Sequence, residues 1–543
     1  MAFDIVIENG LVVDGTGAPG RQADVGLAGK QIAAIGNLEG APAARRLDAA
    51  GCVVAPGFID IQNHSDLALL ADGRAESMIR QGVTTQVTGN CGLTPAPVHD
   101  GVREDLRKTL IGSEYDGPWN WDSFGQFLDR LRAVPKATHV APLVGHGAIR
   151  AAGMGFDDRR PAPAELASMR RLTAEAMEAG AFGMSTGLVF PPGLYCDTEE
   201  LIDLSRVVSA HGGFYASHMR GEANPVVESV QEVLRIVREA GIAAQISHHK
   251  AAGRENWGKV RITYSLIEEA SRTHDVSFDV YPYTAGSANL SQLLPPWSHA
   301  GGPEAMLARL RDPAVRPRVI RDAVHGTPDW GNFFRIDWQD IKLAYVASER
   351  NRWMQGSSVL EVAQRLGRDP VELAADLILE DDNRTTMVNF VMAEADVDFL
   401  LPKSQSMIGS DGRSFSSDGP TSGGHPHPRS YGAFPRVFAR YVRDKGVLRL
   451  EEAVHKMTGK PAKKLRLDRR GELKEGYAAD LVVFDPQTIR DRATFEAPHQ
   501  FAEGIHWVIV DGHLTLDRGT LSERLVGQVL APAPSRRPRP TSR

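Results

Sequence analysis

Residues 55–66 read APGFIDIQNHSD, an apolar run that opens at Pro56-Gly57 and ends in a polar cluster containing His64. Parallel strands that are buried on both faces of a sheet appear in a sequence as continuous apolar runs of this kind. In a barrel of such strands, the carboxyl ends carry the chemically active side chains. The stretch therefore predicts a first barrel strand that delivers His64 to the active face.

Four further apolar runs end in the same way, each at a side chain of a type that binds metal ions. They end at Cys91 (GVTTQVTGNCG), His218 (GGFYASH), His248 (GIAAQISHH) and Asp411 (SMIGSD). Thiolate, imidazole and carboxylate are ligands of catalytic zinc sites, in which the protein supplies about three groups and leaves a position for water. We expect Cys91, His218 and His248 to supply the three ligands. Asp411 would accept the proton of the attacking water, a chemistry that suits amide hydrolysis.

The middle of the chain alternates strand and helix signals, as repeated βα units do. The amphipathic stretch 225–241 leads into the run that ends at His248, and about 30 residues, the length of one βαβ unit, separate this histidine from His218. Such repeats predict an α/β fold whose parallel sheet closes into a (β/α)8 TIM barrel over residues 56–469. Between about 290 and 397 the rhythm breaks, and an insertion of this length favours a lid or substrate-binding subdomain.

Both ends of the chain carry short apolar runs separated by turn residues, the pattern of small antiparallel sheets. Residues 1–55 and 470–528 share this texture, so we expect them to form one small β-sandwich domain beside the barrel. Two unrelated sheets are the alternative. The stretch 529–543 is rich in Pro and Arg, and we expect it to be disordered.

Composition limits the class of partner and compartment. The 62 Lys and Arg residues against 68 Asp and Glu give a net charge of −6, so no overall field favours nucleic acid or an anionic membrane. Three cysteines, Cys52, Cys91 and Cys196, are too few for a disulfide framework in 543 residues, which fits a reducing cytoplasm. The chain has no signal-peptide pattern and no run of about 18 apolar residues. We expect a soluble, cytoplasmic protein with a small-molecule substrate, and its oligomeric state stays open.

Motifs along nearly the whole chain resemble the N-acyl-D-amino acid deacylases, or D-aminoacylases, of the amidohydrolase superfamily. The matching motifs are PGFID, QGVTTQVTGNCG, LVGH, GMSTGLVFPP, YASHMRGE, ISHHK, DVYPYTAGS, MIGSDG, HPHPR, KMTGKPA and GYAADLVVFDP. The resemblance implies an amidohydrolase-type barrel and zinc-dependent hydrolysis of N-acyl-D-amino acids to a carboxylate and a free D-amino acid. It alone implies the preference for D over L substrates.

The resemblance also implies roles for single residues. Cys91, His218 and His248 match the zinc ligands of the family, in which the cysteine replaces the carbamylated lysine of many relatives, and Asp411 matches the general base. The groups that bind the substrate's α-carboxylate match Lys250, Tyr281, Ser287 and Arg429. A guanidinium offers a bidentate fork to a carboxylate, while Lys and Tyr add charge and a directed hydrogen bond. The preference for a neutral, D-Glu or D-Asp side chain depends on the insertion and stays open.

One position departs from the family pattern. Most members carry His-x-His at the end of the first strand, whereas this chain has Gln62-Asn63-His64. A neutral amide is a poor zinc ligand beside an imidazole, so a second metal site built from His64 and Asp411 is expected to be weak or empty. We predict one tight zinc ion per chain.

Two other functions remain as alternatives at this point. A metal-dependent hydrolase of another linear or cyclic amide, of the hydantoinase or dihydroorotase kind, is disfavoured by Cys91. A non-catalytic barrel scaffold would account for Gln62, but the intact ligand set argues against it.

Two other histidines lie near the predicted site. His146 is expected to contact the site or the substrate. His249 is expected to face away from the site, because side chains alternate along a strand.

Overall fold

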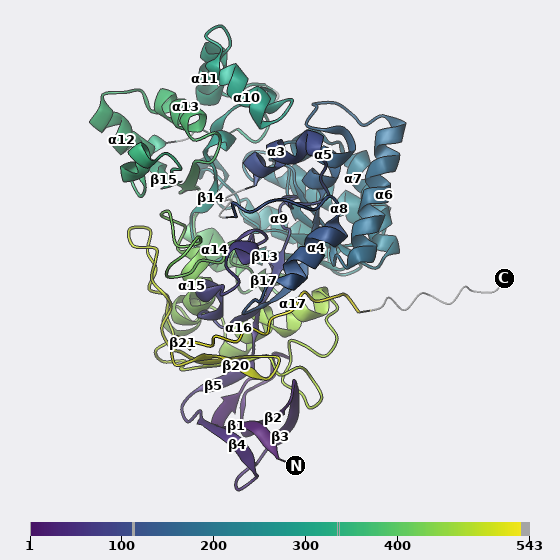
Figure 1. Ribbon diagram of the computed structural model, residues 1–543, viewed down its shortest axis with the longest axis vertical. Coiled ribbons are helices and arrows are strands. Elements are labelled where there is room, and N and C mark those ends of the chain that lie inside the picture. Colours follow the sequence, from purple (N-terminus) through teal and green to yellow (C-terminus); the bar gives the residue numbers. More distant parts are fainter. Residues whose placement is uncertain (1, 111–114, 329, 334, 336, 534–543) are drawn as a thin grey trace, which may run out of the picture.

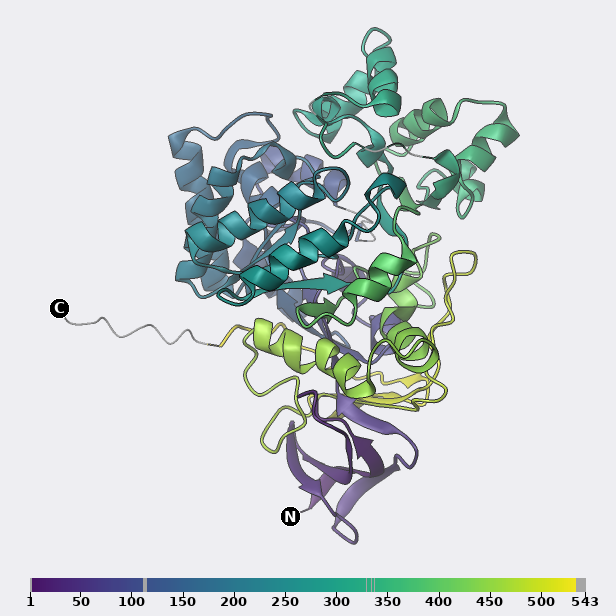
Figure 2. The same ribbon diagram turned by 180° about the vertical axis from the view of Figure 1, so that it is seen from behind.

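The computed structural model describes residues 2–110, 115–328, 330–333, 335 and 337–533. A barrel of strands and helices forms its centre, as Figure 1 shows. A teal and green lobe from the middle of the chain lies at one end of the barrel, and the strands of both chain termini lie at the other. Figure 2, seen from behind, shows the same order of the three parts.

The barrel consists of parallel strands that are neighbours in chain order. In the described part of the chain, eight positions are filled, with β8 and β9 as one interrupted strand. They are β6 (Phe58–Asp60), β7 (Val83–Thr88), β8 (His139–Pro142) with β9 (Val144–Gly145), β10 (Gly183–Gly187), β11 (Phe214–His218), β12 (Ala243–Ile246), β13 (Val276–Val280) and β17 (Ser406–Ile408). The ring closes where the backbone N–H of Asp411 donates to the carbonyl oxygen of Gln62 at 2.8 Å and that of His64 donates to Gly412 at 2.9 Å. The predicted α/β barrel is confirmed.

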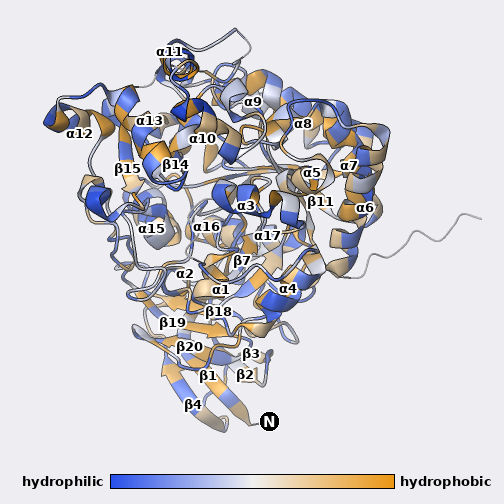
Figure 3. Ribbon diagram, turned by 45° about the horizontal axis from the view of Figure 1, so that its top comes forward, coloured by the Kyte–Doolittle hydropathy of each residue, from blue (hydrophilic) through white to orange (hydrophobic). Residues whose placement is uncertain are grey.

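Amphipathic helices cover the outer face of this barrel. In α8 (Val226–Ala240), Val226, Val230, Val233 and Val237 recur at helical spacing and are buried, and Gly241 ends the helix in the left-handed region at φ 60°. Figure 3 shows hydrophobic and hydrophilic residues alternating along the outer helices, as one buried face requires. The others around the barrel are α3 (Asp100–Thr109), α4 (Phe124–Ala133), α5 (His146–Met154), α6 (Pro163–Ala179), α7 (Thr198–Ala210), α9 (Val260–Ala270), α14 (Glu394–Leu400), α15 (Arg429–Arg436), α16 (Leu450–Met457) and α17 (Gly459–Lys464).

The insertion has a sheet and a core of its own. Strands β14 (Gly286–Asn289), β16 (Thr386–Asn389) and β15 (Ile341–Tyr345) form an antiparallel sheet in that order. The helices of the lobe are α10 (Pro303–Arg311), α11 (Arg316–His325), α12 (Val359–Leu366) and α13 (Pro370–Glu380). Leu307, Val319 and Leu377 belong to a buried cluster that is separate from the barrel core. The lobe is therefore held together by its own apolar contacts.

The terminal strands join in one sheet around a shared core. Their order is β21-β20-β19-β18-β5-β1-β2-β3, with β4 also paired to β1. The two ends of the chain meet where Val54 of β5 lies opposite Val483 of β18, and Val25 and Trp507 share one buried cluster. The strands are β1 (Phe3–Val12), β2 (Arg21–Ala28), β3 (Gln31–Gly36), β4 (Ala43–Asp48), β5 (Val53–Pro56), β18 (Leu481–Phe484), β19 (Ile505–Val510), β20 (His513–Asp517) and β21 (Thr520–Leu521).

Two details of the terminal segments differ from the sequence predictions. The pairing is mixed rather than antiparallel, because β4 and β5 both run parallel to β1 along its two halves. The expected disorder over 529–543 is wrong at its start. Leu530 is 9% exposed and donates its backbone N–H to Val140 at 2.8 Å, since the apolar run before the Pro/Arg-rich stretch pairs with β8. Residues 534–543 lie outside the described residues.

Among the helices of the described ranges, none is long and apolar enough to cross a membrane.

Candidate metal centre

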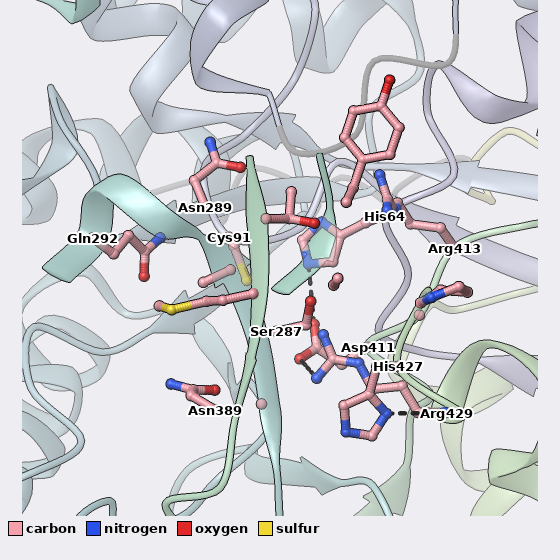
Figure 4. Close-up of a pocket in the computed structure, with 18 of the residues that line it drawn as sticks. His64, Cys91, Ser287, Asn289, Gln292, Asn389, Asp411, Arg413, His427 and Arg429 are labelled. Carbon is pink, nitrogen blue, oxygen red and sulfur yellow. Dashed lines mark hydrogen bonds and ion pairs between the residues drawn. The ribbon is translucent and has the colours of Figure 1, made fainter. Parts of the chain in front are cut away.

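A cavity of about 390 Å³ lies at the carboxyl ends of the barrel strands, where the insertion forms part of its wall. Its lining brings together side chains that are far apart in the sequence and contains every residue expected to bind metal or substrate or to act as the base. These are His64, Cys91, His218, His248, Lys250, Tyr281, Ser287, Asp411 and Arg429. In the described part of the chain, the lining does not include His146, which was expected to contact the site. Figure 4 shows part of this lining, with His64 and Arg429 directed toward Asp411.

One thiol and two imidazoles converge at the ends of β7, β11 and β12. Ligand atoms of Cys91, His218 and His248 lie within 4.8 Å of one another, and the Cys91 Sγ is 3.4 Å from the His248 Nε2. The backbone is left-handed at Cys91, His248 and Asp411, with φ of 55°, 35° and 51°. Such a conformation costs a non-glycine residue about 1–3 kcal/mol and is concentrated at functional sites.

Both ligand types are uncharged in the buried site when no metal cation is present. Burial lowers the pKa of His218 to about 3, so its imidazole is neutral, as metal binding requires. Burial, together with the nearby Asp411 carboxylate, raises the pKa of the Cys91 thiol well above its ordinary value. The thiolate form therefore needs a cation beside it, and thiolate with imidazole is a donor set that suits zinc better than magnesium or calcium.

Asp411 is held on both of its carboxylate oxygens. Arg429 Nη1 lies 2.5 Å from Oδ2, and His64 Nε2 lies 3.1 Å from Oδ1. Burial alone would raise the pKa of Asp411, but the Arg429 guanidinium and the imidazoles of His248 and His64 hold it well below its usual range. The carboxylate is therefore ionised and fixed in direction, and while Arg429 and His64 contact it, it is a weaker base than a free aspartate.

A buried cationic wall adjoins this centre. Lys250 and Arg429 are 6% and 5% exposed. The Lys250 Nζ lies 5.8 Å, and the Arg429 Cζ 4.9 Å, from the centroid of the Tyr281 ring. Ser287 reaches the same cavity from strand β14 of the insertion. Each cation also pairs with a buried carboxylate, Lys250 with Glu222 and Arg429 with Asp411, and their remaining N–H groups can donate to a further carboxylate.

Gln62 stands where the family pattern places the first histidine of the His-x-His pair. Its side chain is fully buried, and its Nε2 donates to the Cys91 Sγ at 3.2 Å. Ligand atoms of His64, Cys91 and Asp411 also lie within 4.8 Å of one another. The amide thus contacts the one sulfur that both candidate metal positions share.

Glu222 was missed by the sequence analysis. Its carboxylate lies 3.0 Å from His248 Nδ1, 2.6 Å from Lys250 Nζ and 3.5 Å from His218 Nε2. Burial alone would raise the pKa of Glu222, but Lys250 and the two imidazoles lower it well below its usual value. No pattern in the sequence pointed to it, because Glu222 lies in the loop after β11 and only the fold brings it to these groups.

Three other histidines differ in their position relative to the cavity. His146 is not among the described lining residues of the cavity; its Nε2 lies 2.8 Å from Glu200 Oε1. His249 points to Thr263, with Nε2 and Oγ1 2.8 Å apart. His427 lines the cavity, and its Nδ1 accepts the backbone N–H of Arg429 at 3.0 Å.

The insertion contributes amide side chains to the cavity. Asn289, Gln292 and Asn389 line it, and in Figure 4 they lie on the side opposite Asp411 and Arg429. These amides and the pair of Asp411 and Arg429 therefore lie on different sides of the cavity.

Comparisons with known proteins identify the family of the chain. Residues 45–515 match the amidohydrolase family. The chain is 40% identical to the D-aminoacylase of Alcaligenes xylosoxydans xylosoxydans, over 97% of this chain and 98% of that protein. It is 38% identical to the N-acyl-D-glutamate deacylase of the same organism, over 96% and 95%.

Solved structures of deacylases have a similar fold over nearly the whole chain. A D-aminoacylase studied for its binuclear metal centre, with one-metal activation and second-metal attenuation, has a TM-score of 0.81 at 38% identity, covering 97% of this chain and 100% of that one. The N-acyl-D-glutamate deacylase of Bordetella bronchiseptica, solved with zinc and a phosphonate mimic of the tetrahedral intermediate, has a TM-score of 0.81 at 33% identity, covering 98% and 100%. A D-hydantoinase, at 15% identity and a TM-score of 0.53, shares the fold alone.

Proposed function

Because the chain belongs to the amidohydrolase family, we propose that it hydrolyses the amide bond of N-acyl-D-amino acids, giving a carboxylate and a free D-amino acid. The observation that carries this proposal is the convergence of Cys91, His218 and His248 beside a buried cationic wall in one cavity. The ligand set opposes a non-catalytic scaffold, and the cysteine opposes the hydantoinase alternative.

The cavity supplies the groups that amide hydrolysis needs. Zinc bound by Cys91, His218 and His248 would polarise the scissile carbonyl and activate water. Asp411 would accept a proton from the attacking water and donate it to the leaving nitrogen. Its two oxygens are already directed by Arg429 and His64, so little reorientation is needed during the reaction.

We propose that the α-carboxylate of the substrate binds to Lys250, Tyr281, Ser287 and Arg429. The support is their shared position on the cavity wall and the burial of both cations. If the carboxylate binds there, the side chain of the amino acid contacts the insertion. The insertion therefore sets the choice between neutral and acidic side chains.

We also propose a cytoplasmic location, because Cys52, Cys91 and Cys196 are all buried free thiols.

Hydrolysis of matched N-acetyl-D- and N-acetyl-L-amino acids by zinc-loaded protein tests the proposed reaction. We expect turnover of D substrates, at most background turnover of L substrates, and loss of both signals in Cys91→Ala. Release of the free amino acid, followed by chromatography, is the measurement. Preferred cleavage of L substrates, or of a hydantoin ring, would contradict the proposal.

Gln62→His tests the proposal of one tight zinc ion. Gln62 donates to Cys91 but offers zinc only a weak amide ligand, whereas an imidazole there would complete a second site with His64 and Asp411. We expect bound zinc after dialysis to rise from about one to about two equivalents per chain, measured by elemental analysis. Gln62→Leu is the control and should stay near one. Two equivalents in the unaltered chain would reject the proposal.

A further inference from the structure

Glu222 contacts three functional side chains of the site, but the proposed reaction gives it no role. It lies in the loop after β11, is 9% exposed, and its carboxylate reaches His248 Nδ1 at 3.0 Å, Lys250 Nζ at 2.6 Å and His218 Nε2 at 3.5 Å. Two of these partners are candidate metal ligands, and the third belongs to the cationic wall. One buried carboxylate therefore connects the two halves of the site.

The Nδ1 of His248 lies between the Glu222 carboxylate and the Lys250 ammonium. Its Nε2 faces the Cys91 sulfur at 3.4 Å, and its Nδ1 faces Glu222. A proton on Nδ1 that donates to the carboxylate leaves the Nε2 lone pair directed toward the metal centre. The Lys250 Nζ also lies 2.8 Å from Nδ1, and an ammonium can only donate, so a proton on Nδ1 requires Lys250 to donate to Glu222 Oε1 instead, 2.6 Å away. In this arrangement Glu222 Oε1 is the shared acceptor for both groups.

The backbone holds Glu222 in this position from two directions. Its N–H donates to Asn332 Oδ1 at 3.0 Å, and its carbonyl oxygen accepts the N–H of Ala252 at 2.6 Å. Asn332 belongs to the insertion and lines the cavity, while Ala252 follows Lys250 by two residues. The Glu222 loop is thus fixed to the insertion and to the segment that carries the lysine.

We propose that Glu222 is a positioning residue that couples the metal centre to the carboxylate-binding wall. It sets the tautomer of His248 for metal binding and holds the Lys250 ammonium beside Tyr281. The second of these roles rests on the proposed function, because it assumes that Lys250 binds the substrate's α-carboxylate. The first role concerns metal affinity and is independent of the substrate.

Glu222→Gln tests both roles. The amide retains the shape but loses the charge that holds Lys250, and it accepts the His248 proton more weakly. We expect zinc affinity to fall about 10- to 100-fold, measured without substrate by competition with a chromophoric chelator. We expect KM to rise about tenfold for an N-acetyl-D-amino acid and to stay within about twofold for the matching α-carboxamide, which lacks the carboxylate.

Two control variants show whether the changes in zinc affinity and KM are specific to Glu222. Glu232→Gln removes a carboxylate of α8 that pairs with Arg220, with Arg220 Nη2 2.9 Å from Oε1, and should change neither quantity. Lys250→Met should raise KM for the acid as Glu222→Gln does, but leave zinc affinity within about threefold of the unaltered chain. Only the Glu222 change is expected to move both.

The outcomes separate this proposal from the proposed function. Zinc affinity within about twofold of the unaltered chain overturns the metal role, even if no substrate is ever turned over. An equal rise in KM for acid and carboxamide overturns the Lys250 role. If Glu222→Gln does not fold, Glu222→Asp decides, because the retained charge should give a smaller loss of zinc affinity and an unchanged affinity would overturn the proposal.

Discussion

Cys91→Ala is expected to remove the tightly bound zinc and to lower kcat/KM for N-acyl-D-amino acids by about four orders of magnitude. The thiol is one of three converging ligands, and the remaining imidazoles of His218 and His248 offer two neutral donors. The site loses its only charged zinc ligand among these three, and without the metal the reaction loses the polarisation of the carbonyl, which is worth several kcal/mol. Zinc content after dialysis and kcat/KM are the two measurements.

Cys52→Ala is the matched control for this variant. Cys52 is also a buried free thiol, 6% exposed, but it lies in the core of the terminal sheet. Its loss should leave zinc content and kcat/KM within about twofold and lower the melting temperature slightly. Retention of one zinc equivalent by Cys91→Ala, with kcat/KM within tenfold of the unaltered chain, would refute the assignment of the ligands.

Asp411→Asn is expected to lower kcat by about 10²- to 10⁴-fold while zinc content stays unchanged. An amide cannot accept the proton of the attacking water, although it fills the same space between Arg429 and His64. The buried Arg429 guanidinium loses its counter-charge, so the melting temperature should also fall. Single-turnover kinetics, zinc analysis and thermal unfolding together measure these effects.

Asp480→Asn separates the catalytic effect from the loss of a buried ion pair. Asp480 is 7% exposed and pairs with Arg470 and with His139, the latter at 3.2 Å, so its surroundings resemble those of Asp411. It lies beside the start of β8, at the opposite end of the barrel from the cavity. We expect a comparable drop in melting temperature with kcat within about twofold. A similar loss of kcat in both variants would contradict the role of Asp411 as the base.

The candidate metal ligands could be located from the sequence because of one physical regularity. A buried parallel strand is a continuous apolar run, and its carboxyl end is the first place where a polar side chain reaches the active face. Cys91, His218 and His248 all follow this rule, and Asp411 does too. The cavity confirms that these strand ends meet. The barrel itself followed from the same alternation of strands and helices.

Three other features of the structure have no comparable pattern in the sequence: Glu222, the sheet of the insertion and the pairing of β4 with β1. Glu222 lies in a loop, where a charged residue is ordinarily solvated, and only the fold brings it against Lys250. The sheet of the insertion joins four- and five-residue strands such as β14 and β15, which are about 50 residues apart. Strands this short leave too little periodicity to be recognised. The parallel pairing of β4 with β1 depends on tertiary contacts, because local propensity does not distinguish it from antiparallel pairing.

The meeting of β5 with β18 also has a consequence for synthesis in the cell. β5 ends at Pro56, and its partner begins at Leu481, about 425 residues later. At 5–20 residues per second the ribosome needs roughly 20 to 85 s to supply that partner. During this time the N-terminal strands display an open edge and apolar side chains, which are typical targets for chaperones. A chain released early cannot cover them, so closure of this sheet marks a completed protein.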